Sequence, residues 1–107
     1  TKFFVSELIR EKIFDLYHEE LPYHTAVLVQ EFKEKATLIK ITADIIVQRD
    51  TQKGILLGQG GNMIKKLGRL PRKDIEAFLD NKVFLELFVK VRPKWRDNDI
   101  YLKEYGY

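Results

Sequence analysis

Three glycines in four residues make Gly58-Gln59-Gly60-Gly61 the most informative run in this sequence. Glycine has no Cβ and adopts positive φ angles without strain, so a ligand can approach the main chain closely at such a run. A helical pattern starts directly after it, and a helix N-terminus offers unpaired N–H groups and a positive dipole end to phosphate. We therefore predict a turn that binds phosphate on the N–H groups of residues 58–61.

Basic side chains are concentrated on either side of this turn. Residues 49–73 hold seven lysines and arginines against one acidic residue, a net charge of +6 in a chain whose total is +3. Such a patch attracts polyanions such as nucleic acid, although clustered lysines are often only a solvated helix face. Ile55 and Ile64 are expected to line an apolar groove for bases. The cations expected to contact phosphate are Lys53, Lys65, Lys66, Arg69 and Arg72.

Two other phosphate-binding motifs are excluded by their spacing. A P-loop requires Gly-x-x-x-x-Gly-Lys-Ser/Thr, but the sixth residue counted from Gly54 is Gln59. A dinucleotide-binding turn requires Gly-x-Gly-x-x-Gly, but the sixth residue counted from Gly58 is Met63. A plain helix–helix turn is the remaining alternative to a nucleic-acid site at these glycines.

No other constellation in the sequence favours catalysis or metal binding. His18 and His24 could form a metal pair, but exposed turn histidines are the favoured interpretation. The carboxylates at positions 19, 20, 97 and 99 are typical of solvated helix ends, with no nucleophile or general base beside them. Cysteine is absent, which excludes disulfides and thiolate metal sites. We predict no enzymatic activity, metal or cofactor within these residues.

Three aromatic side chains could contact bases by stacking. Trp95 is one, but anchoring a terminal helix is the favoured interpretation of its position. Phe84 and Phe88 alternate onto one face of a predicted strand, where they could form a stacking platform. Cover by a helix is the favoured interpretation for this pair.

Hydrophobic periodicity predicts the elements that position the glycine turn. Residues 1–20 have the three- and four-residue spacing of an amphipathic helix, which Leu21-Pro22-Tyr23 should end. Residues 25–32 and 38–48 favour two strands joined by a hairpin turn at 33–35. Residues 83–91 alternate most clearly and predict a third strand.

Helical patterns fill the remaining segments. Asp50 or Thr51 should cap a short helix that ends at Leu57, and residues 97–105 predict a terminal helix. Residues 62–79 predict a longer helix, which Pro71 should kink or split. One three-stranded sheet with helices on one face would bury every apolar stripe, so we predict a single α+β domain over residues 1–107. No apolar run approaches the roughly 20 residues that span a bilayer, so a soluble cytoplasmic protein is expected.

The residues around the turn also resemble a known family. Residues 52–61 are similar to the KH signature, in which an aliphatic stretch precedes Gly-x-x-Gly. Nearly the whole chain resembles the C-terminal domain of Era-type GTPases. That resemblance rests on the glycine turn and on residues 9–12, 20–23, 72–76, 82–85, 89–91, 95–98 and 106–107.

The resemblance implies a type II KH fold that binds single-stranded RNA, namely small-subunit ribosomal RNA near its 3′ end. It also implies a role in assembly of the small ribosomal subunit. A monomer is expected, because nothing in the sequence demands a dimer. By the same resemblance, a GTPase domain that binds GTP and Mg²⁺ lies before Thr1, and the protein contacts the inner face of the cell membrane peripherally. The alternative from a different functional class is a protein-docking module that regulates an attached GTPase.

Two positions depart from the family pattern. The family usually has a lysine in the glycine turn where this chain has Gln59, and the lost charge should weaken phosphate attraction and its salt dependence. The family also has a small helix-forming residue in place of Pro71, so Arg69 and Arg72 are expected to be displaced.

Overall fold

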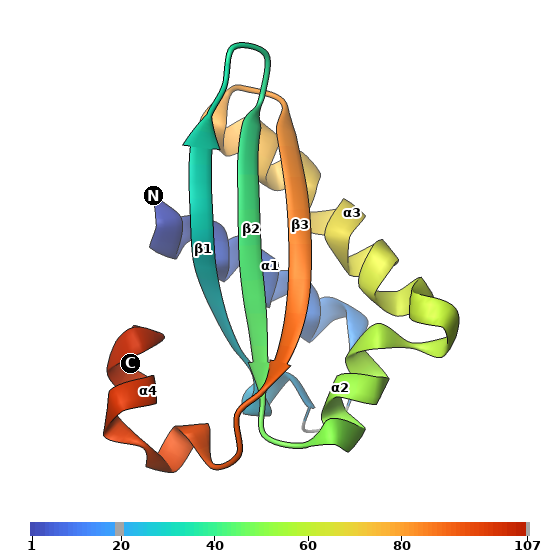
Figure 1. Ribbon diagram of the computed structural model, residues 1–107. Helices are drawn as coiled ribbons and strands as arrows, with labels where there is room; N and C mark the ends of the chain where they lie inside the picture. The colour runs from blue at the N-terminus through green and yellow to red at the C-terminus, as the bar shows by residue number, and fades with distance from the viewer. Residues whose placement is uncertain (19–20, 107) are drawn as a thin grey trace.

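A three-stranded sheet organises the computed structural model, which describes residues 1–18 and 21–106 (Figure 1). Most helices lie behind this sheet, and the chain ends in a short helix at its lower side. In chain order the elements are α1 (Lys2–Leu16), η1 (Leu21–His24), β1 (Ala26–Glu34), β2 (Ile39–Val47), α2 (Asp50–Leu57), η2 (Gln59–Gly61), α3 (Asn62–Leu79), β3 (Val83–Val91), η3 (Trp95–Asp97) and α4 (Asp99–Glu104).

The sheet has the order β1-β2-β3, antiparallel between β1 and β2 and parallel between β2 and β3. A parallel pair requires a crossover connection, and here α2, the glycine turn and α3 form it. The most buried strand, β2, is therefore central, and β3 lies at an edge. The crossover places the glycine turn and α3 on the β3 side of the molecule, as Figure 1 shows.

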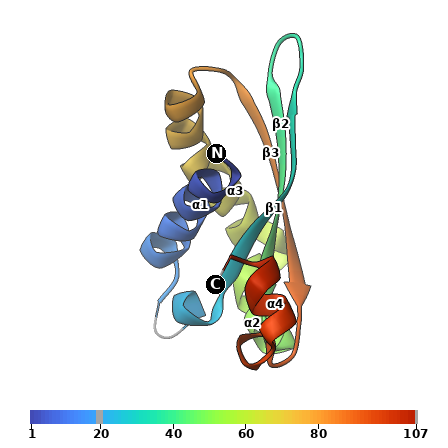
Figure 2. The same ribbon diagram turned by 90° about the vertical axis from the view of Figure 1, so that its left-hand side faces the viewer.

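The main core lies between the sheet and two helices on one face, as predicted (Figure 2). From α1, the side chains of Val5, Ile9 and Ile13 are completely buried at a four-residue spacing. From α3, Leu67 and Ile75 are completely buried. These stripes meet the inward side chains of β2, so the layering follows directly from the periodicity of each segment.

The ends of the first elements differ from the prediction. The helix α1 ends at Leu16, and Glu19 and Glu20, where its end was predicted, lie outside the described residues. The strand β1 continues to Glu34, so the hairpin turn follows residue 34 instead of occupying 33–35. Lys33 pairs with Lys40, because exposed charged side chains can extend an antiparallel ladder without any change in hydrophobic pattern.

Two predictions about the crossover helices are wrong. The N-cap of α2 is Arg49, and the Gln52 side-chain Oε1 accepts the backbone N–H groups of Gln48 and Arg49 at 2.9 and 3.0 Å. Pro71 was predicted to kink or split α3, and the split is the part that is wrong, because α3 runs without interruption from Asn62 to Leu79. The buried Pro71 ring lies one helical turn from Leu67, and its packing in the core offsets the missing N–H.

The C-terminal segment covers part of the opposite face of the sheet. Trp95, 3% exposed, packs with Tyr105 against Ala26 and Ile46, and the two rings meet edge to face at 5.8 Å. The anchoring role predicted for Trp95 is therefore confirmed. The terminal helix predicted for residues 97–105 is α4, which starts after Asn98 because the Asn98 Oδ1 accepts the N–H groups of Ile100 and Tyr101.

A buried acidic side chain on this face forms an ion pair whose contribution to stability can be measured. Asp44 is 2% exposed, and its carboxylate accepts hydrogen bonds from Lys90 Nζ at 2.7 Å and Gln30 Nε2 at 2.8 Å. We expect Lys90→Ala to lower the free energy of unfolding by about 1–3 kcal/mol, because it leaves a buried carboxylate without its cation. Urea denaturation measures this loss, and Lys103→Ala, at an exposed lysine, should change it by less than about 0.5 kcal/mol. Equal effects of the two variants would contradict the argument.

Candidate nucleic-acid interface

The glycine turn has the backbone geometry that the sequence predicted. Gly58 has φ 71° and ψ 175°, Gly60 has φ 62° and ψ 17°, and Gly61 has φ 75° and ψ 16°. The last two are left-handed conformations, and that of Gly58 is essentially restricted to glycine. Three of four consecutive residues therefore need positive φ, which brings the chain from the end of α2 directly into α3.

Fewer N–H groups of the turn face outward than predicted. Gly58 N–H donates to Gly54 O at 3.0 Å, and Gly61 N–H donates to Gly58 O at 3.1 Å. Those two groups are used within the chain, so the prediction of four phosphate-binding N–H groups is wrong. The N–H groups of Gln59 and Gly60 have no acceptor among the described residues. The turn therefore offers two adjacent donors.

A groove of about 460 Å³ runs between α3 and the edge strand β3. The α3 wall consists of Ile64, Lys65, Gly68, Arg69 and Arg72, and the β3 wall consists of residues 84–87. The outward side of β3 has no neighbouring strand, so its backbone N–H and C=O groups are available to a ligand. The groove thus combines apolar side chains, three cations, the carboxylate of Glu86 and strand-edge hydrogen-bonding groups.

This arrangement of a three-glycine turn, a basic helix and an edge strand corresponds to a known domain. Residues 20–96 match the family described as KH domain. This chain belongs to the KH domain family. The predicted resemblance to KH domains is therefore confirmed.

The relatives of this KH domain are longer proteins. The chain is 53% identical to the GTPase Era of Geobacter sp. (strain M21) and 51% identical to that of Geotalea daltonii, over 99% of its own length in both cases. It spans 36% of the length of these curated relatives. The similarity to Era-type GTPases thus covers the whole chain but about a third of the relatives.

Solved structures confirm the fold. Aquifex aeolicus Era bound to GDP and aluminium fluoride superposes with a TM-score of 0.94 at 36% identity, over 99% of this chain and 36% of that one. Era in complex with MgGDPNP and nucleotides 1506–1542 of 16S ribosomal RNA superposes equally well, at the same identity and coverage. The α+β fold with its three-stranded sheet is thus the fold of the corresponding part of Era.

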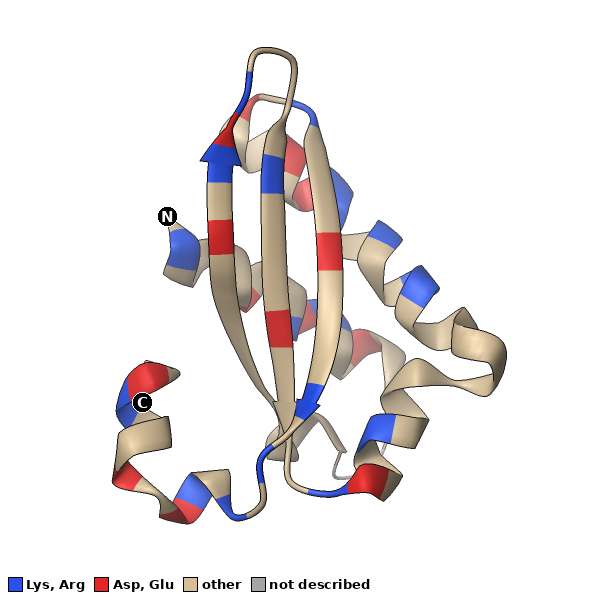
Figure 3. Ribbon diagram, viewed as in Figure 1, with Lys and Arg blue, Asp and Glu red and all other residues tan. Residues whose placement is uncertain are grey.

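The KH domain brings together some of the predicted site residues and separates others. The groove is lined by Ile64, Lys65, Arg69 and Arg72, so both arginines lie at the groove although Pro71 stands between them. Lys53, Ile55, Lys66 and the four residues of the glycine turn do not line it; the turn lies just before the N-terminus of α3. In Figure 3 the first part of α3, next to the turn, carries only basic coloured segments, and its charged residues up to position 73 are all lysine or arginine.

Gly68 and the β3 residues Leu85, Glu86 and Leu87 of the groove were missed by sequence reasoning. A Cβ built at Gly68 would meet no atom within 4 Å, so its absence widens the groove without relieving a clash. A glycine inside a helical pattern was the available signal. No local pattern indicates which helix faces an edge strand, because that depends on the crossover.

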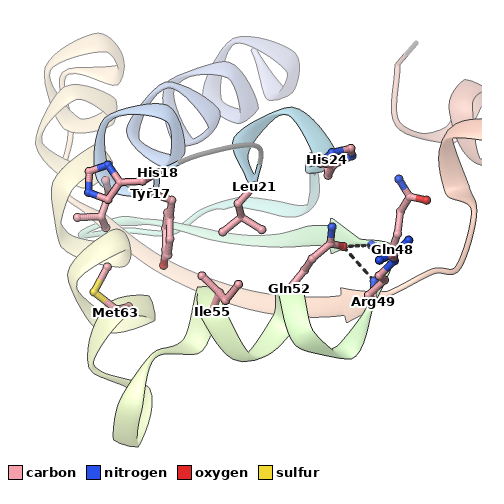
Figure 4. A pocket seen from close by; sticks show the side chains of 10 residues that line it. Tyr17, His18, Leu21, His24, Gln48, Arg49, Gln52, Ile55 and Met63 are labelled. Atoms are coloured by element: carbon pink, nitrogen blue, oxygen red, sulfur yellow. Dashed lines mark hydrogen bonds between the residues drawn. The ribbon is translucent and has the colours of Figure 1, made fainter.

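A second hollow, of about 700 Å³, lies between α2 and the end of α1 with the η1 segment after it (Figure 4). Ile55 and Met63 line it together with Tyr17, His18 and Leu21 from the end of α1 and the segment after it. This hollow is separate from the groove. The prediction that Ile55 and Ile64 line one common groove is therefore wrong.

Tyr17 holds the two helices at this hollow together. Its hydroxyl donates to Leu56 O at 2.6 Å, and burial raises the pKa of Tyr17 to about 12. The phenol therefore stays protonated and donates throughout the neutral range. The bond fixes the last turn of α2, which leads directly into the glycine turn.

Two histidines lie near this hollow. Arg96 Nη1 lies 3.4 Å from Nδ1 of the half-buried His24, and His18 is exposed. Within residues 1–18 and 21–106, no group of three or more His, Cys, Asp or Glu side chains could hold a metal ion. No helix in the same ranges is long and apolar enough to cross a membrane.

Proposed function

We propose that this KH domain binds single-stranded RNA in the groove between α3 and β3. The RNA that we propose is the segment near the 3′ end of small-subunit ribosomal RNA. The observation that carries the proposal is that α3, which starts directly after the glycine turn, supplies the basic wall of a groove whose other wall is the edge strand β3. The solved complex of Era with a 16S ribosomal RNA segment supports this choice of RNA.

The two walls of the groove are proposed to bind different parts of the RNA. Lys65, Arg69 and Arg72, with the N–H groups of Gln59 and Gly60, attract phosphates at the turn and along α3. The bases then face Ile64, Leu85 and Leu87, and their edges reach the unpaired backbone groups of β3. Base edges are accessible in this way only in an unpaired strand, which is why we expect single-stranded RNA to be preferred.

The remaining roles concern the whole protein. We propose that the domain acts as part of a monomeric Era-type GTPase in assembly of the small ribosomal subunit, in the cytoplasm and with peripheral membrane contact. GTP and Mg²⁺ would bind outside these 107 residues, since no run in them has the P-loop spacing. The 36% coverage of the GTPase relatives supports this division.

Fluorescence anisotropy tests the proposal. The 107-residue chain is titrated into a labelled single strand carrying the small-subunit 3′-end sequence, a scrambled strand and a duplex, at two salt concentrations. Preferential, salt-sensitive binding to the first strand is expected. Equal affinity for all three would contradict the groove as a reader of unpaired bases. No binding to any of them would favour the protein-docking alternative.

The groove cations give a quantitative prediction for the same assay. Lys65→Ala, Arg69→Ala and Arg72→Ala should each weaken binding several-fold and reduce the slope of log affinity against log salt by about 0.7. Lys66→Ala is the matched control, because this exposed neighbour does not line the groove and should leave the slope nearly unchanged. If all four variants had the same slope of log affinity against log salt, the RNA would be bound by a diffuse basic patch and not specifically by the groove cations.

A further inference from the structure

Two large aromatic rings lie exposed on the outer face of β3. Phe84 is 51% exposed and Phe88 is 46% exposed, so the prediction that a helix covers them is wrong. They are four residues apart on one strand and therefore point to the same face, about 13 Å apart along it. On that face they stand beside Lys40 and Asp44 of β2.

The C-terminal segment covers this face only near β1. Trp95 and Tyr105 pack on Ala26 of β1 and Ile46 of β2, which leaves the outer side of β3 uncovered (Figure 1). Single exposed apolar residues are common, but two half-exposed rings aligned on one strand offer two stacking positions on the same face.

This surface is continuous with the groove. Phe84 lines the groove together with Leu85, so β3 separates the groove from the outer face by the width of one strand. We propose that RNA leaving the groove crosses β3 and stacks two unpaired bases on Phe84 and Phe88. The proposal rests on the proposed function, because it adds a second contact to the same strand of RNA.

The charges around the rings favour this path. Glu86 lies between the two phenylalanines on the same face, so its carboxylate repels phosphate from the centre of the strand. The RNA backbone is therefore held toward Lys65 and Arg69, and the bases project onto the rings. Asp44 beside Phe88 is paired with Lys90 at 2.7 Å, so it adds little repulsion. Stacking on aromatic rings tolerates any base, because every base has a flat π-face.

The test compares a groove-length RNA of four nucleotides with longer RNAs that add four unpaired nucleotides on the 5′ or the 3′ side. The 107-residue chain should bind one of the longer RNAs more tightly than the short one. Phe88→Ala should lower the affinity for that longer RNA about tenfold, which is the expected effect of losing one stacked base. It should leave the affinity for the short RNA unchanged. Phe88 is the better position to change, because Phe84 also lines the groove.

Phe78→Ala is the matched control, a 49% exposed phenylalanine on α3 that does not line the groove. It should bind all RNAs as the unsubstituted chain does, and circular dichroism confirms that both variants fold. Equal binding of the longer RNAs by Phe88→Ala and the unsubstituted chain would overturn the stacking proposal and leave the groove intact. Failure of the unsubstituted chain to bind even the short RNA would overturn the proposed function and the stacking proposal together.

Discussion

Replacing Gly60 and Gly61 together with aspartate should abolish RNA binding by this KH domain, with a loss of affinity greater than about a hundredfold. Two carboxylates would stand beside the N–H groups of Gln59 and Gly60, where we place a phosphate, and such like-charge contacts cost several kcal/mol. The fold should survive, because a Cβ at Gly60 meets nothing within 4 Å and one at Gly61 meets only Ile64 at 4.0 Å. Aspartate also tolerates left-handed φ better than most residues.

The matched control is the double substitution of Gly60 and Gly61 with asparagine. Asparagine has nearly the same shape and the same tolerance of positive φ but no charge. Anisotropy titrations should therefore show that it retains most of the affinity, while thermal unfolding is similar for both variants. If the asparagine variant also lost binding, side-chain bulk or backbone change would be responsible in place of charge, and the phosphate assignment would be wrong.

Gly58→Ala should destabilise the domain by about 3 kcal/mol or more, the largest effect on stability that we expect from one added methyl group. The backbone at this position, with φ 71° and ψ 175°, is essentially closed to residues with a Cβ. An added Cβ would also lie 2.5 Å from Met63 Cγ and 2.6 Å from Asn62 Oδ1, inside van der Waals contact. Urea denaturation measures the loss.

Gly54→Ala is the control for this substitution. Gly54 lies within α2, and a Cβ there meets no atom within 4 Å, so alanine should stabilise the helix by about 0.5–1 kcal/mol. The two variants thus add the same group one helical turn apart with opposite expected signs. A Gly58→Ala variant as stable as the unsubstituted domain would mean that the turn relaxes to another conformation.

The local sequence pattern was sufficient to predict most helices and strands and the glycine turn. Strand β3 has the predicted bounds, Val83–Val91, because strict alternation has one solution in a half-buried strand. The three glycines among residues 58–61 are sufficient to predict positive φ, since few other residues adopt it repeatedly. The cations that line the groove, Lys65, Arg69 and Arg72, were also identified from their nearness to that turn.

Tertiary structure decided which surfaces meet. The groove requires β3 to be an edge strand beside α3, and this follows from the parallel crossover and not from either segment alone. Ile55 lies close in sequence to the glycines but lines a different hollow, because the turn redirects the chain between α2 and α3.

The outer face of the sheet shows the same limit. Ile46 on β2 is covered by the C-terminal segment, whereas Phe88 on β3 is exposed, although both are apolar residues on outward positions. Residue type and periodicity determine to which face a side chain points. Whether that face is buried depends on a segment distant in sequence, and its position is determined only when the whole chain has folded.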